Sequence, residues 1–293
     1  MERLFSFPGW RIRSMKGPAA RRGKPLAAGE SNIRVIEGWD GRPVEAVQSL
    51  GGVWALVDLR QNLILPDELL WPPAAILQKL YQSRQLRAFP EESRGSLTRL
   101  LGYYCDLQSL HSEDAITWSF FGTLSSAEHH AGLSNWLLDR LGLPWKNERC
   151  KLELWRRIPH PDKPVSGGPE LDFSLIGDQV VIFGEVKWLS GEGLGQGVLR
   201  DKGQLQLRRE FLERYAKSLF AVNHALVLQV LLNPPALEGM SQKPQGVESR
   251  AINWATLAEW AGHPLQEEFK RYYTWKLNLT RRSKPRAVAN SSA

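Results

Sequence analysis

The chain has 293 residues, which is enough to bury a sizeable core in one elaborated domain or in two. Its formal net charge is +7 at pH 7, and the excess of basic residues lies in 1–25 and 281–293, so the body between them is slightly acidic. Two cysteines are too few for a disulfide scaffold or a cysteine-based zinc site, and a cytoplasmic location is expected.

The N-terminal region has weak structural signals. Residues 14–31 are rich in Gly, Pro, Ala and basic residues, which indicates an arm or a linker. Short strand-like runs follow at 33–36 and 53–59, and a helix is predicted after Pro73. No chemistry is evident here, so we expect residues 1–95 to form an N-terminal extension whose role the sequence leaves open.

The central part of the chain is mainly helical. The pattern runs from about Ser96 through Leu124 and continues in a second helix that Gly142 and Pro144 end. Residues 152–155 are predicted to form the first core strand, and a loop rich in Pro and Gly leads from it to the next strand.

The remaining elements complete the predicted fold. Residues 225–232 form a continuous apolar run, typical of a strand buried on both faces and far too short to span a membrane. Helical patterns over 254–260 and 266–275 follow. This order predicts an α/β fold with a mixed central β-sheet flanked by helices. We expect the core domain to cover 96–280 and a basic disordered tail to cover 281–293.

Acidic side chains occupy two neighbouring strands in residues 168–188, GPELDFSLIGDQVVIFGEVKW. Side chains two apart on a strand share a face, so Glu170 and Asp172 are expected together on the first strand. Glu185 and Lys187 are expected together on the second strand for the same reason. If these two faces coincide, carboxylates and an ammonium group meet on one side of the sheet.

The turn between these strands sets their register. Gly177 and Asp178 fit a two-residue hairpin turn, because Gly is preferred at the first central position of a type II′ turn. That turn would place Asp172 opposite Phe183 and make Asp172 a diagonal neighbour of Glu185 on one face. A slip of one residue would move Asp172 to the opposite face.

Burying two carboxylates and an ammonium group on one face of a core costs free energy, since buried charges need partners or metals. Mg²⁺ prefers oxygen ligands and is often held by one or two carboxylates plus substrate phosphate. Asp172 and Glu185 would hold Mg²⁺ or Mn²⁺, and Lys187 would orient water and stabilise charge on a phosphate. The alternative is an exposed strand end with an incidental Glu-x-Lys salt bridge, which contributes little.

This stretch resembles the PD-(D/E)XK nuclease superfamily, whose restriction-endonuclease-like fold also includes archaeal Holliday junction resolvases. The matching pieces are Asp172 in ELDFSL, a hairpin, and Glu185 with Lys187 in FGEVKW. The resemblance implies that the two acids bind metal and that the lysine assists the attacking water. Leu171 stands where a Pro often precedes the Asp, and Glu170 remains a second candidate ligand.

A helix before the core adds a further candidate. Superfamily members often carry a Glu on such a helix, and SEDAITWSFFGTL places Glu113 at a helix start. The resemblance implies a catalytic role for Glu113 as a third metal ligand. Ser112, Glu113 and Asp114 equally fit a plain helix cap that complements the helix dipole, and the two interpretations are compatible.

The helix predicted after the hairpin, DKGQLQLRREFLERYAKSLF, carries polar candidates. Several subfamilies place a Gln here beside the metal and its water, and Gln204 is the candidate for that role. Lys202, Arg208 and Arg209 offer contacts to nucleic-acid phosphates, because the Arg fork matches phosphate oxygens. Each of the three also fits an ordinary surface charge.

The leading hypothesis is therefore a Mg²⁺-dependent nuclease that hydrolyses phosphodiester bonds, with DNA the expected substrate and RNA left open. A role in defence, mobile-element maintenance or repair would suit this fold. The second hypothesis is a nucleic-acid-binding or assembly subunit that keeps the fold without cleaving. The third is an interaction protein with no nucleic-acid role. We expect a homodimer or a partner subunit of a larger system, and no membrane association.

Overall fold

The computed structural model describes residues 33–48, 53–67, 69–82, 105–124, 130–162, 168–189, 202–233 and 246–282. Three predictions lie outside these residues: the arm over 14–31, the start of the helical region at Ser96, and all but the first two residues of the basic tail. Among the described helices, none is long and apolar enough to cross a membrane.

The core is a five-stranded sheet in the order β4-β5-β6-β7-β8. Its strands are β4 (Cys150–Leu154), β5 (Phe173–Gly177), β6 (Val180–Val186), β7 (His224–Leu231) and β8 (Val247–Asn253). β4, β5 and β6 pair antiparallel, whereas β6, β7 and β8 pair parallel. The predicted mixed sheet is confirmed. β8 was not predicted, because this edge strand is mostly half-buried and its sequence VESRAIN lacks an apolar run.

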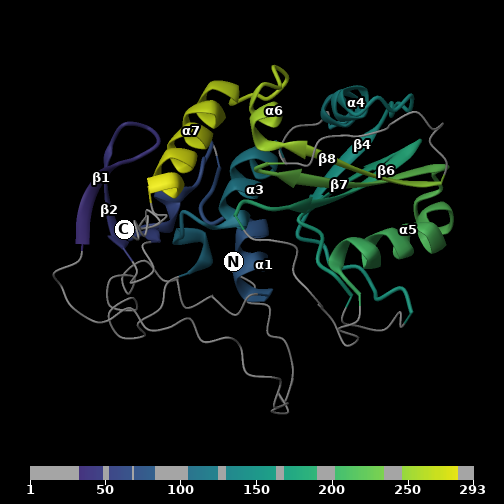
Figure 1. The fold of residues 1–293 in the computed structure, drawn as a ribbon, viewed down its shortest axis with the longest axis horizontal. Helices are drawn as coiled ribbons and strands as arrows, with labels where there is room; N and C mark the ends of the chain where they lie inside the picture. The colour runs from purple at the N-terminus through teal and green to yellow at the C-terminus, as the bar shows by residue number, and fades with distance from the viewer. Residues whose placement is uncertain are drawn as a thin grey trace, which may run out of the picture.

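Helices cover both faces of this sheet (Figure 1). They are α3 (Glu113–Phe121), α4 (Ala131–Arg140), α5 (Gln204–Phe220), α6 (Trp254–Ala258) and α7 (Gln266–Arg282). α5 packs on one face, where Phe211 meets Val181 and Phe183. The other four contribute to the cluster on the opposite face, which contains Phe173 and Leu175. The sheet is therefore enclosed between two helical layers.

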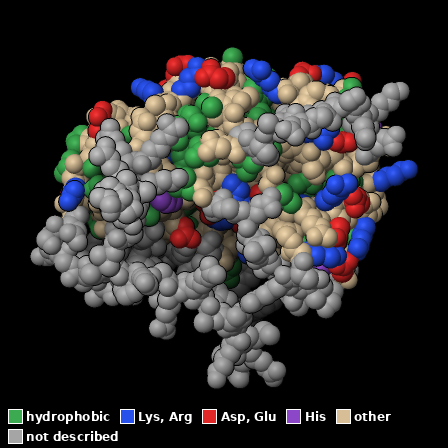
Figure 2. Space-filling model, in the orientation of Figure 1, with side chains coloured by type: hydrophobic (Ala, Val, Ile, Leu, Met, Phe, Trp, Pro, Cys, Tyr) green, Lys and Arg blue, Asp and Glu red, His purple; other side chains and the backbone are tan. Residues whose placement is uncertain are grey.

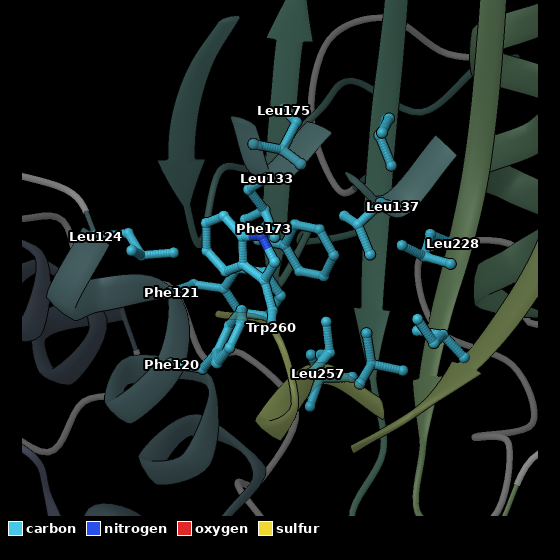
Figure 3. Close-up of a cluster of buried hydrophobic side chains, with 14 of the residues drawn as sticks. Phe120, Phe121, Leu124, Leu133, Leu137, Phe173, Leu175, Leu228, Leu257 and Trp260 are labelled. Atoms are coloured by element: carbon cyan, nitrogen blue, oxygen red, sulfur yellow. The ribbon is translucent and has the colours of Figure 1, made fainter. Parts of the chain in front are cut away.

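Aromatic rings pack among aliphatic side chains on the face opposite α5 (Figure 3). Phe121 of α3 stacks on Phe173 of β5 with ring centroids 3.9 Å apart. Gly184 of β6 lies against the Phe173 ring, since a Cβ atom at Gly184 would come within 2.0 Å of it. The glycine lets a large ring lie flat on the neighbouring strand.

The described N-terminal residues form a three-stranded antiparallel sheet and a helix. The elements are β1 (Ile33–Glu37), β2 (Pro43–Gln48), β3 (Trp54–Leu56), the short 3₁₀ helix η2 (Leu59–Asn62) and α1 (Ala74–Gln82). Two further 3₁₀ helices, η5 (Asp106–Gln108) and η6 (Gly122–Leu124), lie before and after α3. α7 lies between the small sheet and the main sheet (Figure 1), and Trp275 Nε1 donates to Glu37 O at 2.8 Å. β2 was not predicted.

The predicted hairpin exists, but its turn lies one residue later than expected. Phe173 pairs with Gly184 and Ile176 pairs with Val181, so the turn residues are Asp178 and Gln179 rather than Gly177 and Asp178. If the same register is extended by one residue pair beyond Phe173 and Gly184, Asp172 lies beside Glu185 and not beside Phe183. The partner of Asp172 changes by two residues, so Asp172 keeps its face. The two acids are thus direct neighbours instead of diagonal ones.

Tertiary contacts explain this turn. Asp178 Oδ1 accepts the backbone N–H groups of Glu148 and Arg149, at 3.0 and 3.2 Å. Asn147 Oδ1 accepts the backbone N–H groups of Gln179 and Val180, each at 3.0 Å. The loop before β4 therefore holds the turn, and the local preference of Gly for a type II′ turn does not decide the register.

Candidate active site

A cavity of about 400 Å³ lies at the end of the main sheet where β5 begins and β6 ends. Its lining holds six carboxylates, namely Asp106, Glu113, Asp114, Glu170, Asp172 and Glu185. It holds three basic side chains, namely Lys79, Lys187 and Arg208. Ser109, His111, Ser112 and Gln204 complete the lining. Acidic groups therefore outnumber basic groups, which makes the cavity attractive to cations.

Asp172 and Glu185 both line this cavity, as neighbours on the hairpin. Asp172 Oδ2 accepts the backbone N–H of Val186 at 2.6 Å, which fixes the carboxylate against β6. Burial raises the pKa of Asp172, although the charge of Arg208 and the Val186 N–H oppose this effect. Burial and the charge of Asp172 raise the pKa of Glu185 to about 7. Two carboxylates held this closely carry unfavourable charge that a cation would relieve.

Lys187 follows β6 directly and points into the same cavity. Its Nζ lies 2.7 Å from Glu185 Oε1 and 3.4 Å from Glu113 Oε2. Burial lowers the pKa of Lys187, but the charges of Glu185 and Glu113 outweigh burial and raise it overall. Lys187 is therefore an ammonium ion at neutral pH. Its backbone is held as well, because its N–H donates to Val230 O at 2.8 Å.

Glu113 begins α3, as predicted, and Ser112 caps that helix by accepting the backbone N–H of Ala115 at 3.0 Å. The Glu113 carboxylate faces the cavity, where Oε1 accepts the backbone N–H of Trp188 at 3.1 Å and Oε2 pairs with Lys187. Helix capping and an inward carboxylate thus coexist. In this arrangement Glu113 holds the segment that carries Lys187.

Arg208 lies inside the protein, with 1% of its surface exposed, so the interpretation as an ordinary surface charge is wrong for this residue. Its guanidinium forms an ion pair with Glu185, and Nη2 also donates to Glu170 O at 2.6 Å. The physical reason is position on α5, since Arg208 shares the sheet-facing side of the helix with Phe211. Gln204, the first residue of α5, lines the cavity one turn earlier.

The other two predicted phosphate contacts lie away from the cavity lining. Lys202 Nζ pairs with Asp162 Oδ2 at 3.0 Å and with Glu210 Oε2 at 2.7 Å. Arg209 is exposed and pairs with Glu213 on the same helix at 2.8 Å. Both cations have carboxylate partners on the protein, and a phosphate would have to compete with those carboxylates.

Several cavity residues were missed by the sequence reasoning, and Lys79 and Asp114 are the two that form an ion pair there. Lys79 comes from α1, in a region that showed no chemistry, and its ammonium group pairs with Glu170 and lies 3.0 Å from Asp114 Oδ1. Burial raises the pKa of Asp114 to about 6 against the attraction of Lys79. Adjacency to Glu113 at a helix start was the one available signal for Asp114. Lys79 had no local signal, because it reaches the cavity only through the fold.

The cavity offers a divalent cation a close pair of carboxylates but not a preassembled group of three ligands among the described residues. Among the described residues, no three His, Cys, Asp or Glu side chains are grouped so that they could hold a metal. The predicted triad of Asp172, Glu185 and Glu113 is therefore not preassembled, since Lys187 pairs with both glutamates. Two carboxylates with water and phosphate oxygens suffice for Mg²⁺, and the close pair Asp172 and Glu185 matches that set.

Comparisons with protein-family models, with characterised proteins and with solved structures gave no match. The resemblance to the PD-(D/E)XK superfamily therefore remains a prediction. It rests on residues 168–188 and on the order of the flanking elements along the chain. The geometry of the cavity stands independently of that resemblance.

Proposed function

We propose that this protein is a metal-dependent nuclease that hydrolyses phosphodiester bonds, with DNA as the expected substrate. One observation carries the proposal: Asp172, Glu185 and Lys187 line the same cavity, with raised pKa values for both acids. A close pair of carboxylates beside a permanent ammonium group suits phosphate chemistry, because it can hold a cation and still present a positive group to an anionic substrate.

The reaction itself is a displacement at phosphorus. The oxygen of a water molecule forms a bond to phosphorus, and the bond from phosphorus to the leaving sugar oxygen breaks. One proton leaves the water, and one proton reaches the leaving oxygen. Bound Mg²⁺ or Mn²⁺ supplies Lewis acidity and lowers the pKa of water. Asp172 and Glu185 are the residues that would hold the ion.

Lys187 has an electrostatic role in this scheme. Its raised pKa keeps it protonated, so it donates hydrogen bonds and does not accept the proton of the water. A fixed ammonium group beside the phosphate stabilises the negative charge that builds up in the transition state. Glu113 keeps this ammonium in place through its ion pair, at 3.4 Å. Gln204 at the cavity wall offers an amide to water or phosphate.

Substrate binding should depend on the metal ion. Without it, the acidic lining repels a phosphate, because carboxylates outnumber basic groups. Figure 2 shows Lys and Arg side chains intermingled with Asp and Glu side chains over the described part of one face. That surface does not offer a broad basic track, so the proposal places phosphate recognition at the cavity and predicts stronger DNA binding with Mg²⁺ than with a chelator.

The test is a cleavage assay on the full chain with labelled DNA and RNA, in Mg²⁺, in Mn²⁺ and in chelator. Asp172→Asn and Lys187→Met should each lower the cleavage rate about a thousandfold, since each removes a charged group that acts on the transition state. Lys151→Met is the matched control, because Lys151 is exposed and pairs with Glu153 on the same strand, at 2.7 Å.

The outcome also separates the alternatives. Cleavage that survives in Asp172→Asn would refute the assignment of the site. Mn²⁺ binding to the parent protein without cleavage of any substrate would favour the non-cleaving subunit. Absence of both metal binding and salt-dependent DNA binding would favour an interaction protein with no nucleic-acid role.

A further inference from the structure

The cavity has two positively charged centres, and only one of them belongs to the predicted catalytic set. Lys187 and Arg208 pair with Glu185 on the sheet side. Lys79 pairs with Asp114 and Glu170 on the other side. Burial lowers the pKa of both lysines, but their carboxylate partners outweigh it: Glu185 and Glu113 raise the pKa of Lys187, and Asp114 and Glu170 raise that of Lys79. Asp172 adds a smaller contribution to both.

Lys79 is held firmly in its position. The residue is 8% exposed, and its ammonium group lies 5.5 Å from the centre of the Trp155 ring. α1, which carries it, packs in a cluster that includes Ile76, Leu80 and Trp155. Burial and two carboxylate partners, Asp114 and Glu170, distinguish this ammonium group from that of a surface lysine. It is therefore a permanent part of the cavity lining.

Removal of this ammonium group would leave a set of ligands suited to a metal ion. Asp114 would lose its cation, and Glu170 would keep only the weaker contact from Arg157, whose Nε lies 3.4 Å from Glu170 Oε2. Both side chains would remain largely buried, with 22% and 19% of their surface exposed. Burial raises the pKa of Asp114, and the charges of Asp172 and Glu170 raise it further against the effect of Lys79. Carboxylate oxygens gathered without a cation are the ligands that hard divalent ions take.

We propose that Lys79 is a built-in cation that occupies the place of a second divalent metal ion between Asp114 and Glu170. The N-terminal region then has a chemical role, because it balances charge on one side of the cavity and limits metal binding to the other side. The inference rests on the proposed function only for the ion at Asp172 and Glu185, and the Asp114–Glu170 side can be tested separately.

The experiment counts Mn²⁺ ions bound per chain by equilibrium dialysis with electron paramagnetic resonance, on the full-length protein. Lys79→Met keeps an apolar stem against Trp155 and removes the charge. We expect one bound ion in the parent protein and one more in Lys79→Met. The double variant Lys79→Met/Asp114→Asn should lose the added ion. Lys151→Met is again the control and should match the parent.

The outcomes are distinguishable. No bound ion in the parent but one in Lys79→Met would uphold the role of Lys79 and refute the proposed catalytic metal. Equal numbers in the parent and in Lys79→Met would overturn the inference.

A second variant covers the case in which Lys79→Met does not fold. Asp114→Asn in the parent background should leave the number of bound ions unchanged, because Lys79 already occupies that place. Loss of an ion in Asp114→Asn would overturn the inference.

Discussion

The two sides of the β5–β6 hairpin differ sharply although they are built from neighbouring residues. Phe173 packs in an apolar cluster, whereas the preceding residue, Asp172, lines the acidic cavity. Ile182 belongs to the same apolar cluster, and Glu185 faces the cavity. Alternation along the two strands thus gives one face that is apolar throughout. The other face is apolar at Val181 and Phe183, under α5, and acidic only at the end that carries Asp172 and Glu185.

The energetics of the two sides have opposite signs. Apolar burial stabilises by roughly 25 cal/mol for each Å² removed from water. The cavity carboxylates work against folding at neutral pH, because burial raises the pKa of Asp114 to about 6 and that of Glu185 to about 7. Each raised pKa unit corresponds to about 1.4 kcal/mol. A protein tolerates such a cost where the charges have a use.

The largest effect is expected on the apolar side, in Phe173→Ala. Phe173 is fully buried and stacks on Phe121, so its truncation should lower the free energy of unfolding by about 4 kcal/mol. Chemical denaturation measures the change. Ser174→Ala is the matched control on the next residue, because its buried Oγ has no hydrogen-bond partner among the described residues. If Ser174→Ala lowered the free energy of unfolding as much as Phe173→Ala, the proposed difference between the two sides would be wrong.

A smaller effect is expected from Lys276, which is fully buried on the apolar side. Lys276 of α7 lies against Trp188 and Tyr272, and its Nζ has no hydrogen-bond partner in the part of the chain that is described. Burial lowers the pKa of Lys276 to about 7. Lys276→Met should therefore raise the free energy of unfolding by roughly 3 kcal/mol at neutral pH.

The stability that Lys276→Met gains over the parent should depend on pH. Between about 7 and the ordinary lysine pKa of about 10.5, the unfolded chain binds more protons at this residue than the folded protein. The stability of the parent should rise with pH across that window, and the advantage of Lys276→Met should shrink. Arg271→Met, exposed on the same helix, is the control. An advantage that stays constant up to pH 10.5 would contradict the buried, neutral state.

The smallest effect is expected at the cavity, in Asp114→Asn. Burial raises the pKa of Asp114 to about 6, so the folded protein binds more protons than the unfolded chain between pH 3.8 and 6. This contribution stabilises the parent at low pH and is lost as pH rises through about 6. In metal-free denaturation curves, Asp114→Asn should therefore keep roughly 2 kcal/mol of unfolding free energy that the parent loses as pH rises through about 6. The exposed Asp139→Asn is the control, and equal pH profiles of Asp114→Asn and the parent would contradict the prediction.

Much of the fold could be predicted from local patterns. The buried strand β7 was predicted from a continuous apolar run, and α3 was predicted to begin at Glu113. The hairpin and the shared exposure of Asp172 and Glu185 to one cavity also agree with strand alternation. β8 was missed because an edge strand with half-buried residues lacks a strong apolar signal.

The candidate site, like the fold, was predicted from the sequence only in part. The sequence by itself determined the Asp172, Glu185 and Lys187 constellation, because residues at short spacing on a hairpin share a face for reasons of backbone geometry. Only the tertiary structure decided the register of that hairpin, since a loop from before β4 holds its turn. Only the tertiary structure brought in Lys79, which meets Glu170 across 91 residues of chain. Contacts of that range follow from packing and leave no periodic trace in the sequence.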